Sequence, residues 1–399
     1  MNTDAATASE AITPERLLWA KRAYATRHVN LDTARVLCTA AVPSTGDVVL
    51  ARVIEVGQHP KLERTDGRRA TLFPGDEVIV VYGDRYAPDQ FHAGVPDDLG
   101  PCALVAAGGI AARVEDAHGK MSAPTTLQPL GLLANVAGRR VNLRDGLTDY
   151  ASVTTGPRPV TIAVVGASMN AGKTTSAAHL VRGLRLAGLR VGAAKVTGTG
   201  AGGDVWLLSD AGAFPVYDFT SAGLPSTYRV GPDEVRRIFV ELTARLALYG
   251  SEVVVVEVAD GVYQQETGEL LADTVFRDNV DGVLFAAVDA LGATAGLAWL
   301  TDRGLKPLAL TGVLSSSPLA VQEAEEATGS QVWGLQHLED PDLAGQLYLD
   351  LRSSRPVAAA ADTADPNPTA EAVLAGRAAP EAGPSPAMAT TGQVGSQVI

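Results

Sequence analysis

The chain has 399 residues, 46% of them hydrophobic, which is enough for two domains with buried cores. Its formal net charge is −13, and this acidic balance argues against a nucleic-acid partner or an anionic membrane surface, because phosphate contacts need clustered lysines and arginines. The start of the chain is polar and acidic, and acidic residues interrupt its longest apolar stretch. We therefore expect a cytoplasmic protein with neither a secretory signal nor a membrane span.

Residues 1–35 are predicted to form a loose tail followed by a helix. The sequence TPE at residues 13–15 supplies a capping hydroxyl, a proline at the first turn and an acid, a combination typical of a helix start. An apolar face that includes Leu18 and Tyr24 predicts that this helix runs to about residue 27.

Residues 36–152 are predicted to form a small antiparallel β domain, barrel-like or sandwich-like. Short runs of β-forming residues alternate with turn signals, and these runs cover residues 48–56, 77–82, 103–105 and 110–114. Residues 82–101 form a long, aromatic and charged segment, for which a functional loop and an irregular connection are equally favoured. Cys38 and Cys102 lie among apolar neighbours and are expected to be buried thiols.

The most informative segment is VTIAVVGASMNAGKTT, residues 160–175. It reads as a buried apolar strand, a loop of small residues, and Gly-Lys-Thr-Thr opening an amphipathic helix, which is the layout of a phosphate-binding loop. The backbone N–H groups of such a loop surround nucleotide phosphates, and the helix N-terminus adds partial positive charge. The residues expected to contact a nucleotide are Ala167, Ser168, Met169, Asn170, Ala171, Gly172, Lys173, Thr174 and Thr175.

Apolar strands alternate with helices from residue 158 to residue 352. Strands are predicted at residues 160–165, 189–194, 215–219, 253–258, 282–288, 308–313 and 331–333, and the clearest helices at 174–187 and 232–249. The alternation predicts an α/β fold with a mostly parallel, doubly wound sheet, whose ligands bind beyond the carboxyl ends of its strands. Residues 353–399 are rich in Ala, Pro, Thr, Gly and Ser, and we predict a disordered tail.

Phosphoryl chemistry also needs Mg²⁺ and groups that stabilise charge on the transferred phosphoryl. Lys173 is expected to reach the β- and γ-phosphates, and the Thr174 hydroxyl to bind Mg²⁺. Glu257 ends a run of four valines, where a buried carboxylate is costly unless a cation accompanies it, so Mg²⁺ is its expected partner. Asp260 competes with it for that role.

The second strand of the domain ends at Lys195, and the Gly-rich loop 197–203 follows it. Asp204 comes directly after this loop and is either a helix cap or a further Mg²⁺ ligand. Polar residues at 226–228 and 263–265, together with the Gly-rich loop, are candidate substrate contacts.

These residues carry a resemblance. The region 158–335 resembles the dethiobiotin synthetase-like branch of P-loop NTPases and is similar to the GTP-binding adaptor of molybdopterin-guanine dinucleotide synthesis. In the synthetase family, a threonine after the loop lysine, an aspartate after the second strand and a glutamate after a later strand hold the metal. The matching residues here are Thr174, Asp204 and Glu257, and Lys195 matches a lysine that lies near the substrate and the transferred phosphate.

Lys173, Lys195 and Glu257 are thus the candidate catalytic residues, with ATP and Mg²⁺ as the expected cofactors. GTP stays open, since neither an adenine-reading asparagine nor a guanine-reading motif is evident. We expect a Mg²⁺-ATP-dependent enzyme, ligase-like or kinase-like, that phosphorylates or activates a small-molecule carboxylate or carbamate. The alternative is a nucleotide-binding adaptor or regulatory NTPase with slow hydrolysis that signals to a partner through the β domain. A homodimer is left open.

Overall fold

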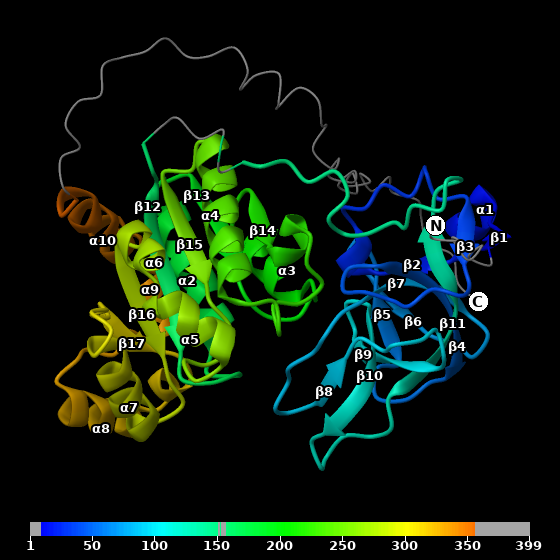
Figure 1. The fold of residues 1–399 in the computed structure, drawn as a ribbon. Coiled ribbons are helices and arrows are strands. Elements are labelled where there is room, and N and C mark those ends of the chain that lie inside the picture. Colours follow the sequence, from blue (N-terminus) through cyan, green and yellow to red (C-terminus); the bar gives the residue numbers. More distant parts are fainter. Residues whose placement is uncertain (1–8, 151, 153–156, 356–399) are drawn as a thin grey trace, which may run out of the picture. The chain divides into compact units, whose positions relative to one another are not determined.

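The computed structural model describes residues 9–150, 152 and 157–355, so the predicted tail lies outside the described residues from residue 356 on. The N-terminal part is built on a largely antiparallel sheet, and the C-terminal part is a parallel sheet with helices on both faces (Figure 1). Of the helices in the described ranges, none is both long enough and apolar enough to cross a membrane.

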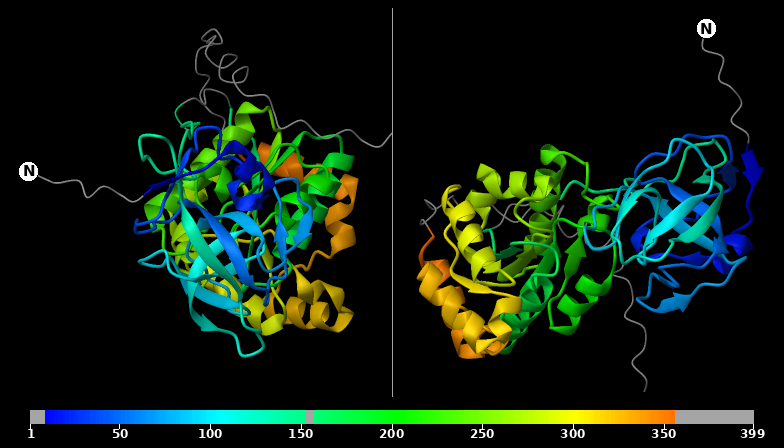
Figure 2. Two further views of the ribbon diagram at one scale, coloured as in Figure 1. Left: turned by 90° about the vertical axis from the view of Figure 1, so that its right-hand side faces the viewer. Right: turned by 90° about the horizontal axis from the view of Figure 1, so that it is seen from below.

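The N-terminal sheet has nine strands, and β4 lies near its centre between β11 and β7, to both of which it is antiparallel. The path runs β1-β3-β11-β4-β7-β10-β8, with β9 on β10 and β11 and with β2 on β7; Figure 2 shows this part from two further sides. Cys38 and Cys102 are buried free thiols within it. The elements are β1 (Ser9–Ala11), α1 (Pro14–Trp19), β2 (Lys21–Arg22), η1 (Tyr24–Thr26), β3 (Val36–Cys38), β4 (Val48–Glu55), β5 (Lys61–Glu63), β6 (Arg69–Thr71), β7 (Glu77–Tyr82), β8 (Phe91–Gly94), β9 (Cys102–Ala106), β10 (Ile110–Ala117) and β11 (Thr125–Ala134).

The prediction that the first helix runs to residue 27 is wrong. It ends at Trp19, and the following Lys21 and Arg22 pair with Val78 and Ile79 of β7. Leu18 is 82% exposed, whereas Tyr24 is fully buried, so the two do not share a face. Pairing with β7 outweighs the local helix pattern, as tertiary contacts often do.

The longest strand of this sheet, β11, was not expected from the sequence. Its ten residues include Pro129 and Gly131, which are typical of turns rather than strands. The pairing of β11 with β4 shifts register between these two residues, so an irregularity absorbs the proline and the glycine while pairing continues on both sides. Strand β8 likewise lies within the segment expected to be a loop.

The C-terminal sheet has six strands, all parallel, in the order β14-β13-β15-β12-β16-β17. The predicted α/β fold with a parallel sheet, preceded by antiparallel strands, is confirmed. The strand expected at residues 331–333 is a single bridge between Leu310 and Val332. The strands are β12 (Val160–Gly166), β13 (Val191–Lys195), β14 (Val216–Asp218), β15 (Val253–Glu257), β16 (Gly282–Ala286) and β17 (Ala309–Thr311).

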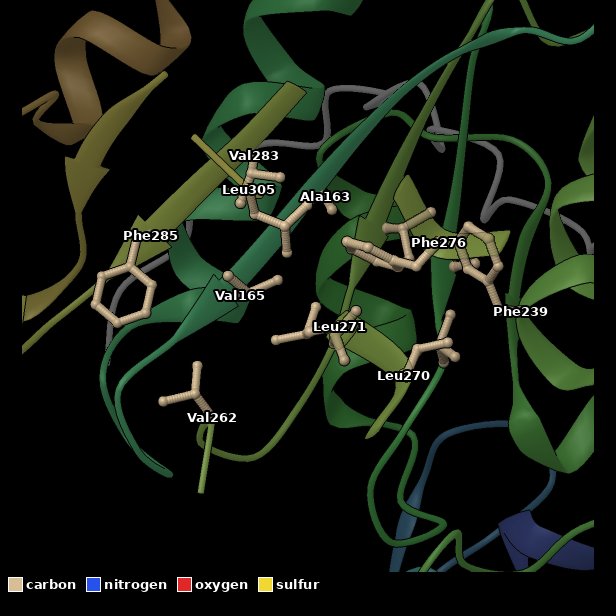
Figure 3. Close-up of a cluster of buried hydrophobic side chains, with 14 of the residues drawn as sticks. Ala163, Val165, Phe239, Val262, Leu270, Leu271, Phe276, Val283, Phe285 and Leu305 are labelled. Carbon is tan, nitrogen blue, oxygen red and sulfur yellow. The ribbon is translucent and has the colours of Figure 1, made fainter. Parts of the chain in front are cut away.

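Alternate side chains of β12 pack into two separate hydrophobic cores, one on each face of the sheet. Ile162 and Val164 pack with α2 and α10, whereas Ala163 and Val165 pack with α4 to α7. In the second core, drawn in Figure 3, the rings of Phe239 and Phe276 lie 5.5 Å apart. The helices are α2 (Lys173–Leu186), α3 (Gly203–Asp210), η2 (Phe219–Ala222), α4 (Pro232–Leu248), α5 (Gln265–Ala272), α6 (Thr274–Asn279), α7 (Ala290–Thr301), η3 (Val313–Ser316), α8 (Pro318–Thr328), α9 (Leu335–Glu339) and α10 (Pro341–Ser353).

A buried polar cluster joins the two parts at the end of β14. The fully buried Asp218 accepts hydrogen bonds from the Tyr24 hydroxyl at 2.8 Å and from Arg27 Nη2 at 3.0 Å. Burial alone would raise the pKa of Asp218, but Arg27 and hydrogen bonds from Thr220 hold it below its usual range. The ionised carboxylate is therefore accommodated by residues contributed from both parts.

We expect Arg27→Ala to lower the free energy of unfolding by about 3 kcal/mol, because it leaves a buried carboxylate without its cation. Because the pKa of Asp218 is depressed, this contribution is complete at neutral pH and is lost as the pH falls below the usual carboxyl range. Urea unfolding at several pH values measures it. The control is Arg52→Ala, since Arg52 is 48% exposed in its pair with Glu77 and should contribute under about 1 kcal/mol. If both variants lose the same free energy of unfolding, Arg27 does not compensate the buried charge of Asp218.

Candidate functional site

The loop between β12 and α2 ends at a glycine in the left-handed region. Gly172, the residue before the helix, has a φ of 92°, and a Cβ there would lie 3.0 Å from Gly312 Cα. Only glycine fits this left-handed position without strain. The loop is anchored by Ala167 N, which donates to Ala286 O at 2.9 Å, and by Ala171 O, which accepts from Val313 N at 3.0 Å. The N-terminus of α2 is thereby held at the carboxyl end of the sheet.

Lys173 is the first residue of α2 and is only 5% exposed. Its ammonium group folds back over the loop and donates to Ser168 O at 2.7 Å. Burial lowers its pKa, although nearby carboxylates, Glu257 first among them, oppose that shift. Among the described residues, the carbonyl of Ser168 is the hydrogen-bond acceptor that holds the ammonium group beside the loop.

Glu257 lies between the loop strand and the second strand. The sheet register places Val164 of β12 on one side of it and Lys195 of β13 on the other. Its Oε1 accepts from the Thr174 hydroxyl at 3.0 Å and lies 3.8 Å from Lys195 Nζ. Its Oε2 is buried and has no hydrogen-bond partner among the residues that the structure describes. A strand, a loop and a helix are thus followed in space by an acidic residue on the neighbouring strand.

The C-terminal part is an α/β fold with the strand–loop–helix layout that the sequence predicts for a phosphate-binding loop. Its parallel sheet, its loop with Gly172 and Lys173, and the carboxylate beside Thr174 all belong to one continuous site.

Acidic and basic side chains lie close together in this site. Burial raises the pKa of Glu257, with Lys195 opposing the shift, and burial also raises the pKa of Asp260. Burial acts against the charge of Lys195, yet Glu257 and Asp204 together raise its pKa. Asp204 does not cap its helix; it pairs with the ammonium group of Lys195. Lys195 is therefore the cation that balances both carboxylates in this state.

The donor set fits Mg²⁺ when nucleotide oxygens complete it. Within the described ranges, no cluster of three or more His, Cys, Asp or Glu side chains could hold a metal alone. Mg²⁺ commonly takes one or two protein ligands and fills its other positions with phosphate oxygens and water. The unpartnered Oε2 of Glu257 and the hydroxyl of Thr174 are oxygen donors of the required kind.

A cavity of about 670 Å³ lies over the loop. The C-terminal part lines it with residues of the phosphate loop, with Lys195, Asp204, Glu257 and Asp260, and with Gly198, Thr199 and Ala201 of the Gly-rich loop. Met169, Asn170, Gly172, Lys173, Thr174 and Thr175 face it, whereas Ala167, Ser168 and Ala171 are not among its lining residues.

Two of the expected substrate segments do not line this cavity. Ser226 and Thr227 are buried and support the Gly-rich loop, where Gly198 N donates to the Thr227 hydroxyl at 2.9 Å. Tyr263 is 80% exposed, and the side chain of Gln264 caps α5. Ser226 and Thr227 therefore support the Gly-rich loop and do not line the cavity themselves.

The N-terminal part supplies the remaining wall of the cavity, with His59, Arg85, Tyr86, Ala87, Gln90, Ala106 and Ala107. The sequence pattern does not single out Arg85 or His59. Arg85 lies in the segment 82–101, which the sequence marks only as a whole, by its length and its aromatic and charged content. His59 lies between β4 and β5, and no motif in the sequence marks it.

No family model and no curated protein matches the chain. Among solved structures, it is similar to the signal recognition particle receptor FtsY from Elizabethkingia anophelis in complex with GDP, with 15% identity, a TM-score of 0.31, and 48% of this chain and 54% of that chain covered. A second FtsY structure from that organism has 16% identity and a TM-score of 0.30, with 53% of this chain and 64% of that chain covered. The signal recognition particle 54 kDa protein from Aeropyrum pernix K1 in complex with GDP has 21% identity and a TM-score of 0.32, with 53% of this chain and 50% of that chain covered. The chain thus spans between half and two thirds of these structures.

We expect Glu257→Gln to weaken Mg²⁺-dependent nucleotide binding by about tenfold or more. The same change should leave the free energy of unfolding within about 1 kcal/mol of its value in the unmodified chain, because the lower cost of burying a neutral side chain offsets the loss of the pair with Lys195, which keeps Asp204. Calorimetric titration and urea unfolding measure the two effects.

The matched control is Glu241→Gln, since Glu241 is also buried with a raised pKa but pairs with Arg237 of its own helix. Its nucleotide affinity should equal that of the unmodified chain. A Glu257→Gln protein destabilised by several kcal/mol would show instead that the pair of Glu257 with Lys195 holds the fold together.

Proposed function

We propose that the chain is a Mg²⁺-nucleoside-triphosphate-dependent enzyme that transfers a phosphoryl group to a small-molecule carboxylate or carbamate, in the manner of a ligase or kinase of the dethiobiotin synthetase-like branch. One observation carries the proposal: a buried carboxylate, Glu257, presents an unpartnered oxygen beside the Thr174 hydroxyl at the start of the loop helix. Such a carboxylate is costly in a ligand-free fold and becomes useful when a metal-bound nucleotide arrives.

Each residue of the site has a defined task in this proposal. The loop amides and Lys173 bind the phosphates, and Lys173 exchanges the carbonyl of Ser168 for a phosphate oxygen. Thr174 and Glu257 would hold Mg²⁺, with Asp204 or Asp260 as the further acid. Bound Mg²⁺ neutralises charge on the phosphoryl oxygens. Lys195, released from Asp204, faces the transferred group and stabilises its charge.

The size of the cavity favours catalysis on a second small molecule. A cavity of about 670 Å³ lies within the range of small-molecule sites, and its walls come from both parts of the chain. We infer ATP as the phosphoryl donor, with GTP tested beside it.

An adaptor function is the second candidate, and one contact favours it. Asn170 of the phosphate loop donates to Asp89 of the N-terminal part at 3.0 Å. A nucleotide that reorders the loop would alter this contact, so the N-terminal part could report nucleotide occupancy to a partner.

We expect Lys173→Ala to weaken nucleotide binding by about a hundredfold, because it removes a buried ammonium group at the phosphate site. Fluorescent ATP and GTP analogues with Mg²⁺ provide the measurement. Lys306→Ala is the control, since Lys306 is an exposed lysine of the same part and is not among the cavity residues. Equal affinities for both variants would refute a phosphate site at the loop.

Release of ADP or GDP separates the enzyme from the adaptor. Purified protein is incubated with Mg²⁺ and either nucleotide, with and without a pool of small metabolites. The enzyme proposal predicts that the pool accelerates release at least about tenfold, because hydrolysis without acceptor is slow. A slow rate that no metabolite changes would favour the adaptor.

A further inference from the structure

Arg85 is a buried cation without a carboxylate partner. It is 8% exposed, and its backbone pairs with Ala93, with Arg85 N donating to Ala93 O at 2.8 Å. Its guanidinium donates from Nη2 to the neutral Gln90 Oε1 at 2.8 Å. Its Nε is buried and unpartnered, and the ion pairs of the described residues do not include it.

A buried arginine usually has an acid beside it, because removing an unpaired charge from water costs several kcal/mol. Burial indeed lowers the pKa of Arg85 to about 10, and only the more distant charges of Asp89 and Asp260 oppose that shift. The side chain therefore remains charged at neutral pH, and among the described residues no carboxylate forms an ion pair with it.

The place of Arg85 indicates where that anion would come from. Arg85 lines the same cavity as Lys173, Lys195 and Glu257. Asp89, four residues further along the chain, accepts a hydrogen bond from Asn170 of the phosphate loop at 3.0 Å. The segment that carries Arg85 is thus in direct contact with the loop.

A second polar atom on this wall also lacks a partner. His59 lines the cavity, and its Nδ1 is buried and without a hydrogen-bond partner among the described residues. Burial, together with the charge of Arg85, lowers the pKa of His59 to about 4, so the ring is neutral at physiological pH. The wall contributed by the N-terminal part therefore offers one positive charge and one neutral hydrogen-bonding nitrogen.

We propose that Arg85 binds an anionic oxygen group, a carboxylate or phosphate, of the acceptor substrate, and that His59 contributes a neutral hydrogen bond to the same molecule. The inference rests on the proposed function and names the class of its substrate: an organic acid held between the N-terminal wall and the phosphate loop. The rival source of the anion is the nucleotide's own terminal phosphate. A guanidinium suits either one, since its N–H groups match the spacing of two oxygens.

The test measures two affinities separately. Protein saturated with Mg²⁺ and a non-hydrolysable ATP analogue is titrated with malonate and, in a second arm, with inorganic phosphate. Arg85→Gln should weaken binding of the preferred anion about tenfold or more, while affinity for the ATP analogue stays within about twofold. Arg113→Gln is the control, because Arg113 is a 52% exposed arginine of the same part and should change neither affinity.

Three results would overturn the inference. One is that the unmodified protein binds neither anion; another is that Arg85→Gln leaves anion affinity unchanged. The third is that Arg85→Gln weakens the ATP analogue instead, which would assign the guanidinium to the nucleotide. If Arg85→Gln fails to fold, Gln90→Ala decides, since it keeps the charge but removes the 2.8 Å bond that orients it. A roughly threefold loss of anion affinity supports the inference, and no change overturns it.

Failure of the proposed function would look different. In that case the unmodified protein would not bind the ATP analogue, or Lys173→Ala would bind it as well as the unmodified protein does. Retained nucleotide binding with no effect of Arg85→Gln on either ligand removes the present inference alone.

Discussion

The burial of one carboxylate organises this molecule. Four consecutive buried valines form β15, so the residue that ends the strand, Glu257, enters the carboxyl edge of the sheet with 2% of its surface exposed. Its neighbours on either side are the strand that leads into the phosphate loop and the strand that ends at Lys195. An ionised group in such a place needs a cation. Lys195 meets that need in this state, and the unpartnered oxygen of Glu257 is available to a second one.

In the proposed function, the balance of charge around that carboxylate explains why a metal and a triphosphate would bind together. On the C-terminal wall, the carboxylates of Asp204, Glu257 and Asp260 face the ammonium groups of Lys173 and Lys195. Alone, this set is slightly acidic and attracts a divalent cation. Once such a cation is bound, the set becomes positive and suits phosphate oxygens. Nucleotide and metal would therefore bind most tightly together.

The parallel sheet and its loop could be predicted because the strands at its centre are short runs whose residues are all buried, and burial of this kind leaves a local signature. The N-terminal part could be predicted only as a class of fold. Its strands β2 and β11 form because β7 and β4 pair with them, and residues such as Pro129 and Gly131 oppose that outcome locally. The same limit applies to the site. Lys173 and Glu257 stand out in the sequence, whereas Arg85 can be recognised as a site residue only from the cavity that it lines.

The choice of side chains on the two walls follows from how each cation tolerates burial. Lysine loses its charge readily when it is desolvated, and Lys173 and Lys195 are both surrounded by carboxylates that oppose this loss. Arg85 has no carboxylate in contact with it and still keeps a pKa of about 10. A guanidinium can therefore hold a permanent charge on a wall that contains no acid, which leaves that charge free for a ligand. A lysine at residue 85 would need an acid beside it, and that acid would compete with any anion that the cavity receives.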